Sequence, residues 1–163
     1  MLIPRLPSTI LNQIALHAET QYPLECCGVL LGPVDERDAI TSIERCRNIQ
    51  DFLHQEDPAQ YPAQAGKAYV MDPHDLLRLQ KYCREHGQQI RVIYHSHPDA
   101  DPFFSLQDQK LALWDGAPLY PESAYLVASV EQGKASRYAL YQWNPVRQVF
   151  FLACQGQFTP SRI

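Results

Sequence analysis

The chain has 163 residues, of which 45% belong to the hydrophobic set and 20% are charged, and 14 basic against 18 acidic side chains give a formal net charge of −4. A chain of this length can bury about 70% of the surface that its unfolded form exposes, so we expect a single globular domain over residues 1–163 rather than a disordered chain. The acidic balance argues against general nucleic-acid binding, and no apolar run approaches the roughly 18 residues of a membrane span, so we expect a soluble, cytoplasmic protein without membrane contact.

The N-terminal part of the chain predicts one helix followed by two paired strands. Apolar residues recur at helical spacing over residues 8–20, where Ser8 can cap the helix and Pro23 limits its extension. Residues 29–31, which two glycines flank, predict a buried strand. Residues 39–45 alternate well enough for a second strand, which we expect to form a hairpin with the first.

The middle of the chain is expected to contain a loop, a short strand and a helix. Residues 56–67 are rich in Pro, Gln and Ala, and we interpret them as a mobile loop within the domain. The sequence leaves open whether this loop closes over a substrate. Residues 68–71 predict a short strand, and Asp72 followed by Pro73 is a strong signal for the start of a helix that Gly87 can end.

The C-terminal half is expected to contain four strands and one helix. A strand over residues 90–94 runs directly into His95, and Ser105 can open a helix that ends near Trp114. The last three strands are predicted over residues 123–130, 136–143 and 148–153. Because helices and strands are interleaved without strict βαβ regularity, we expect an α/β fold in which helices flank a mixed sheet.

The cysteines show no pattern of a disulfide framework. They lie at positions 26, 27, 46, 83 and 154, without a Cys-x-x-Cys pair or a spacing typical of a zinc ribbon. We therefore interpret them as reduced and mostly buried thiols.

Three potential metal ligands lie within one short segment of the sequence. Side chains alternate across a strand, so His95 and His97 point to the same side, and Pro98 then turns the chain. Asp108 lies three residues after Ser105, so it falls in the first helical turn and can face back toward the strand end. Two histidine nitrogens and one carboxylate are a common ligand set for catalytic zinc, with the fourth position left for water.

Each of these pieces has a simpler explanation when it is taken alone. Ser105 and Asp108 could form only a helix cap with an acid that complements the helix dipole, and the two histidines could simply form hydrogen bonds. The combination of all the residues at one strand end, one turn and one helix start favours a metal site instead. The remaining histidines, at positions 17, 54, 74 and 86, lack such neighbours, so we expect them to be solvated or to belong to the core.

The run His-Ser-His-Pro at 95–98, followed by Ser-x-x-Asp at 105–108, resembles the zinc signature of the JAMM, or MPN-plus, metalloproteases. That family carries an upstream glutamate just before a small pair of residues and an apolar strand, and Glu25 followed by Cys-Cys-Gly at 26–28 matches it. The resemblance covers nearly the whole chain. It implies a cytidine-deaminase-like fold with a mixed, largely antiparallel sheet.

The resemblance also implies a role for each residue of the motif. His95, His97 and Asp108 would hold Zn²⁺, Glu25 would act as the general base and pass its proton to the departing amine, and the Ser105 hydroxyl would bind the oxyanion.

The resemblance implies a metallopeptidase that cleaves an amide bond at or beyond the C-terminal Gly-Gly of a ubiquitin-like protein. The short chain is similar to compact bacterial members that process ubiquitin-like sulfur-carrier proteins. A non-catalytic MPN-type interaction module is the alternative, although such modules usually lack one or more ligands. A DNA-associated protein of the RadC type has a similar motif, but the acidic balance and Glu25 argue against it. The carrier and the oligomeric state stay open.

Overall fold

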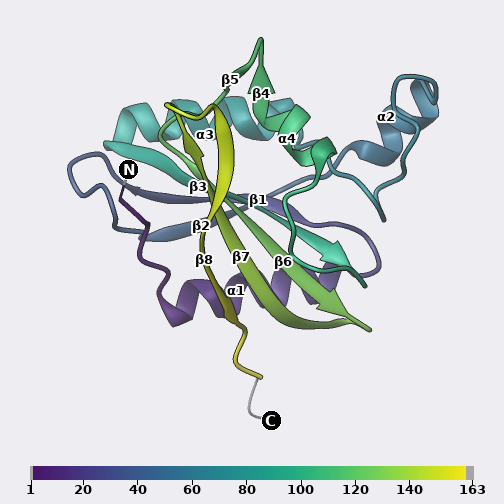
Figure 1. Cartoon of the computed structure of the whole chain (residues 1–163), viewed down its shortest axis with the longest axis horizontal. Coiled ribbons are helices and arrows are strands. Elements are labelled where there is room, and N and C mark those ends of the chain that lie inside the picture. The colour runs from purple at the N-terminus through teal and green to yellow at the C-terminus, as the bar shows by residue number, and fades with distance from the viewer. Residues whose placement is uncertain (1, 161–163) are drawn as a thin grey trace.

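A six-stranded sheet forms the centre of the computed structural model, which describes residues 2–160 (Figure 1). In spatial order the strands are β2 (Ser42–Cys46), β1 (Cys27–Pro33), β3 (Gln88–Pro98), β6 (Ala124–Glu131), β7 (Lys134–Asn144) and β8 (Val149–Gln157). Strands β3 and β6 pair in parallel, and the other four neighbouring pairs of this sheet are antiparallel. The expected mixed, largely antiparallel sheet is therefore confirmed.

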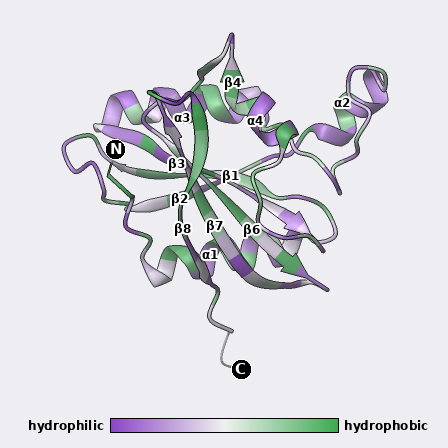
Figure 2. Ribbon diagram, viewed as in Figure 1, coloured by the Kyte–Doolittle hydropathy of each residue, from purple (hydrophilic) through white to green (hydrophobic). Residues whose placement is uncertain are grey.

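Helices cover both faces of this sheet, and each face carries its own hydrophobic core. Helix α1 (Ser8–Gln21) packs on one face, whereas α3 (Pro73–His86) and α4 (Leu106–Ala112) lie on the other (Figure 1). Strands β1 and β6 are hydrophobic along most of their length because both faces of each strand are buried (Figure 2). Among residues 2–160, no helix combines the length and the apolar composition that crossing a membrane requires.

The ends of α3 follow the signals in the sequence, whereas the start of α1 does not. Asp72 caps α3 by accepting a hydrogen bond from the His74 backbone N–H, and Gly87 ends the helix with a left-handed φ of 60°. The cap predicted at Ser8 is wrong, because Ser8 is already helical and Pro7, which precedes it, has no side chain that can accept a hydrogen bond.

The segment between β2 and α3 differs most from the prediction. It contains a short helix, α2 (Gln50–Glu56), which projects from the side of the molecule together with the loop after it (Figure 1). Strand β2 begins at residue 42 rather than at 39. Residues 68–71 do not form a strand and make a single bridge, between Met71 and Asn48. The Asn48 side chain binds the Ala68 carbonyl and the Val70 N–H, which are backbone groups that a neighbouring strand would bind in a sheet.

The helix predicted to end near Trp114 stops at Ala112. Residues Leu113–Trp114 (β4) pair with Ala117–Pro118 (β5) in a small separate hairpin. The hairpin turn is Asp115 followed by Gly116, and both residues have a positive φ, as a tight two-residue turn requires.

Candidate metal centre

The three expected ligands lie together in the folded chain. His95 and His97 are near the end of β3, on the sheet face that α3 and α4 cover, and Asp108 is in the first turn of α4. The Nε2 atoms of the two histidines are 3.2 Å apart. Asp108 Oδ2 lies 3.3 Å from Nε2 of His95 and 3.4 Å from Nε2 of His97. All three side chains are buried.

This triangle of donor atoms fits a zinc ion. Ligand atoms that lie about 2.0–2.1 Å from a tetrahedral zinc ion are separated from one another by about 3.4 Å, which is close to the three observed distances. Imidazole nitrogens and a carboxylate oxygen are also donors that zinc prefers. His95, His97 and Asp108 could therefore hold zinc without a rearrangement of the backbone.

The second nitrogen of each histidine has a different environment. His97 Nδ1 donates a hydrogen bond to the carbonyl of Asp101 at 3.0 Å, so Nε2 is the ring atom that would bind a metal ion. His95 Nδ1 is buried and has no hydrogen-bond partner. The ring of His95 stacks instead on Tyr69, with ring centroids 4.4 Å apart and an angle of 23° between the planes.

Asp108 and Ser105 form a reciprocal cap at the start of α4. The Ser105 backbone N–H donates to Asp108 Oδ2 at 2.9 Å, and the Asp108 N–H donates to Ser105 Oγ at 3.0 Å. Burial on its own would raise the pKa of Asp108, but the charge of His95 and the hydrogen bonds from both histidines and Ser105 outweigh burial and hold that pKa well below its usual range. Asp108 is therefore ionised, as a metal ligand must be.

Glu25 lies beside this centre because β1 and β3 are antiparallel neighbours. Cys27 pairs with His95, so Glu25, just before β1, is next to the end of β3 that carries His97. Burial raises the pKa of the Glu25 carboxyl to about 8, an effect that His97 opposes and Asp108 reinforces. Its Oε2 atom is buried and has no hydrogen-bond partner.

Two residues that the sequence analysis did not select also adjoin the centre. Tyr69 contacts His95 by stacking, and Asn48 donates a hydrogen bond to the backbone carbonyl of Glu25 at 3.0 Å. Neither residue lies in a recognisable motif, since both belong to the segment between β2 and α3 where the prediction of secondary structure was least successful.

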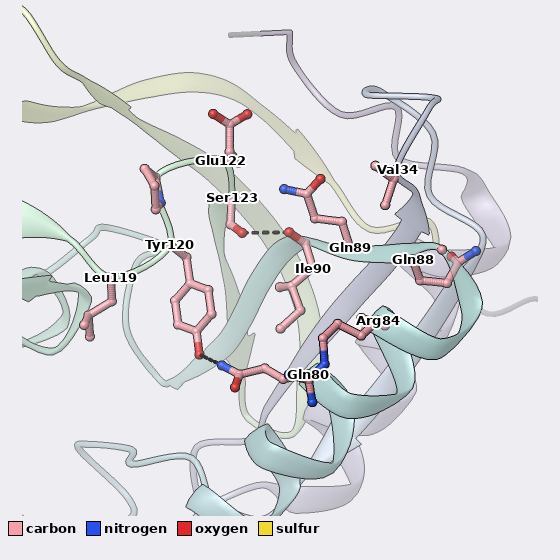
Figure 3. Close-up of a pocket in the computed structure, with 13 residues that line it drawn as sticks. Val34, Gln80, Arg84, Gln88, Gln89, Ile90, Leu119, Tyr120, Glu122 and Ser123 are labelled. Carbon is pink, nitrogen blue, oxygen red and sulfur yellow. Dashed lines mark hydrogen bonds between the residues drawn. The ribbon is translucent and has the colours of Figure 1, made fainter.

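A cavity of about 530 Å³ lies elsewhere on the molecule, between α3, the beginning of β3 and residues 119–123 (Figure 3). Gln80 donates a hydrogen bond to the Tyr120 hydroxyl at 3.3 Å, and the Ser123 hydroxyl donates to the Ile90 carbonyl at 2.7 Å. None of the three ligand residues lines this cavity, so it is separate from the metal centre.

Comparisons with known proteins agree with this architecture. A family model that describes prokaryotic homologues of the JAB domain matches residues 7–141. The chain is 27% identical over 136 residues to the desampylase of Haloferax volcanii, and the match covers 83% of this chain and 81% of that protein. It is 25% identical over 120 residues to the CysO-cysteine peptidase of Mycobacterium tuberculosis, with 74% and 68% covered.

Solved structures of two further proteins have the same fold. A protein from Salinibacter ruber matches with a TM-score of 0.61 and 25% identity, over 93% of this chain and 89% of that chain. The protein DSY2949 from Desulfitobacterium hafniense matches with a TM-score of 0.59 and 24% identity, over 87% and 84%. The second match supports the fold alone.

Proposed function

Because this chain belongs to the family of prokaryotic homologues of the JAB domain, we propose that it is a zinc-dependent peptidase that cleaves an amide bond at or beyond the C-terminal Gly-Gly of a ubiquitin-like sulfur-carrier protein. The names of the desampylase and the CysO-cysteine peptidase support action on a small modifier or carrier protein. The observation that carries the proposal is the triangle of His95, His97 and Asp108 donor atoms, with sides of 3.2–3.4 Å.

Glu25 is the general base in this proposal. His95, His97 and Asp108 would hold the zinc ion, which when bound would supply Lewis acidity and lower the pKa of water to about 7. Glu25 accepts the proton of the attacking water and transfers it to the nitrogen of the departing amine. Its burial supports this task, because a pKa of about 8 lies close to neutral pH, where a carboxyl group can both accept and release a proton.

Ser105 binds the oxyanion of the tetrahedral intermediate. Its Oγ already accepts the Asp108 N–H, so the hydroxyl hydrogen is the part of the group that stays available for a new hydrogen bond. A donor of this kind is typically worth about 3 kcal/mol in the transition state. The same serine therefore caps the helix that carries a ligand and donates to the reacting group.

The test uses a ubiquitin-like carrier with residues added after its Gly-Gly. We expect mass spectrometry to show shortening of the tail when zinc is present, loss of shortening with a chelator, and recovery when zinc is returned. His97→Ala removes a ligand, whereas His74→Ala, at an exposed position on α3, is the matched control that should keep full activity. A protein that copurifies without stoichiometric zinc and leaves every tail intact would instead be an interaction module.

A further inference from the structure

We propose that Asn48 is a positioning residue of the metal centre, because one side-chain amide joins the backbone of Glu25 to the segment whose Tyr69 packs on His95. The proposal rests on the function proposed above and adds to it a residue that sets the position of both the general base and one ligand. Asn48 lies in the connection between β2 and α2 and touches none of the three ligands through a hydrogen bond.

The amide of Asn48 uses its full hydrogen-bonding capacity. Its Nδ2 donates to the Glu25 carbonyl at 3.0 Å and to the Ala68 carbonyl at 3.2 Å. Its Oδ1 accepts the backbone N–H of Gln50 at 3.0 Å and that of Val70 at 3.1 Å. Two donors and two acceptors are all that a primary amide offers, so the orientation of this side chain is fully determined.

The position of Glu25 depends on its backbone. The Glu25 N–H donates to the Ala65 carbonyl at 2.8 Å, and the Glu25 carbonyl accepts the bond from Asn48. No hydrogen bond holds Oε2 of its side chain. The two hydrogen bonds of the Glu25 backbone, of which Asn48 provides one, therefore help to set the location of this carboxylate, together with the bonds that join Cys26 to Ser96.

Tyr69 lies between Ala68 and Val70, and Asn48 binds the backbone of both of these residues. Asn48 holds the carbonyl of Ala68 and the N–H of Val70, so it fixes the backbone on both sides of Tyr69. The Tyr69 ring stacks on His95, whose Nδ1 has no hydrogen-bond partner. Outer contacts of this kind orient a ligand ring, and here stacking does so in place of the hydrogen bond that orients His97.

Other contacts keep the segment attached when Asn48 is replaced. The Ile49 backbone N–H donates to the Val70 carbonyl at 2.8 Å, and Asp51 Oδ1 accepts the Ala65 N–H at 2.7 Å. We therefore expect Asn48→Ala to fold, with Glu25 and Tyr69 displaced by a small distance rather than released.

The first experiment uses Co²⁺ as a spectroscopic probe of the ligand geometry. We expect Asn48→Ala to weaken cobalt affinity about tenfold and to change the visible absorption spectrum of the bound ion. Tyr69→Leu should have the same effect, whereas Tyr69→Phe keeps the stacked ring and should bind cobalt within about twofold of the wild type. The matched control is Asn144→Ala, which removes an amide that accepts two backbone N–H groups in the turn after β7.

The second experiment is a double-mutant cycle for peptidase turnover. At saturating zinc, where weaker metal affinity does not limit turnover, Asn48→Ala should lower kcat about 10²-fold in the wild-type background and by a clearly smaller factor when Glu25 is already Gln, because the part of the loss that acts through the Glu25 carboxylate is then absent. Equal losses in both backgrounds, or an unchanged cobalt spectrum in Asn48→Ala, would overturn the proposal. A wild type without peptidase activity would contradict the proposed function only, since the cobalt measurements judge Asn48 independently.

Discussion

Among the single residues of the centre, Asp108 is placed for two tasks that the sequence presents as alternatives. Its Oδ2 atom accepts the Ser105 N–H, as in a helix cap, and the same atom faces Nε2 of both histidines. The cap therefore does not compete with metal binding, because it holds the carboxylate in the orientation that a ligand needs. Ser105 supports the ligand in this way whether or not it also donates to an oxyanion.

The two tasks of Ser105 can be separated by measuring stability and turnover on one variant. Ser105→Ala should reduce the free energy of unfolding by about 1 kcal/mol because the cap is lost. The same change should lower kcat by about 10²–10³-fold because the oxyanion loses a donor. Urea denaturation and steady-state kinetics provide the two values, and unchanged kcat would remove Ser105 from the chemistry.

Glu25 makes the metal-free protein less stable as the pH rises. The Glu25 pKa is 4.5 in the reference state and about 8 in the folded chain, so above pH 4.5 the unfolded chain releases a proton that the folded chain retains. The stabilisation present below pH 4.5 is lost as the pH rises toward 8. Metal-free Glu25→Gln should therefore be more stable than the metal-free wild type at pH 8, by roughly 2–4 kcal/mol. Urea denaturation at pH 5 and pH 8 checks this, and an equal difference at both values would contradict it.

At the scale of elements, β3 connects the two faces of the molecule. Val92 and Tyr94 point into the core under α1, whereas Ile93 points into the core under α3 and α4, and His95 continues on that second face. Alternation along one strand thus places Val92 and Tyr94 on one side and Ile93 and the proposed metal ligands on the other. The position of the ligands consequently depends on how α1 and the rest of the sheet hold β3.

One contact between α1 and β3 should respond to pH. The hydroxyl of Tyr94 lies 2.8 Å from Nδ1 of His17, and burial, with a smaller effect of Arg45, lowers the pKa of His17 to about 4. Because the unfolded chain takes up this proton near pH 6.5, the contribution of His17 to stability is present above pH 6.5 and is lost as the pH falls toward 4.

We expect this effect to amount to roughly 2–3 kcal/mol between pH 6.5 and pH 4. His17→Gln has no titrating ring, so its unfolding free energy should fall less over that range than that of the wild type. Parallel curves for the two proteins in urea denaturation would show that His17 does not titrate in this way.

At the scale of the whole molecule, the centre is the meeting point of segments that lie far apart in the sequence. Glu25 precedes β1, the histidines end β3, Asp108 begins α4, and Tyr69 comes from the connection between α2 and α3. A bound ion would link β3 directly to α4. Metal binding is therefore expected to stabilise the folded chain as a whole.

Removal of zinc should lower the melting temperature. A ligand at about 100 times its Kd stabilises the folded state by about 2.7 kcal/mol, which for a chain of this size corresponds to roughly 5–10 °C. Thermal unfolding with zinc and with a chelator measures the shift. His97→Ala should melt at the same temperature under both conditions, and an equal shift in that variant would place the stabilising ion elsewhere.

The sequence by itself determined the features that depend on neighbouring residues. Alternation put His95 and His97 on one side of a strand, the spacing of Ser105 and Asp108 gave a capped helix start, and Asp72 with Gly87 set the ends of α3. These features follow from backbone geometry and short-range hydrogen bonds, so each can be recognised from a few neighbouring residues of the sequence.

Only the tertiary structure decided which distant residues complete the centre. The stacking of Tyr69 on His95 and the four hydrogen bonds of Asn48 join parts of the chain between which no local pattern exists. The raised pKa of Glu25 likewise results from burial, which depends on how the segments pack. Residues 68–71 are a further example. Their composition is typical of a strand, but they make a single bridge, and the Asn48 side chain binds the backbone of Ala68 and Val70.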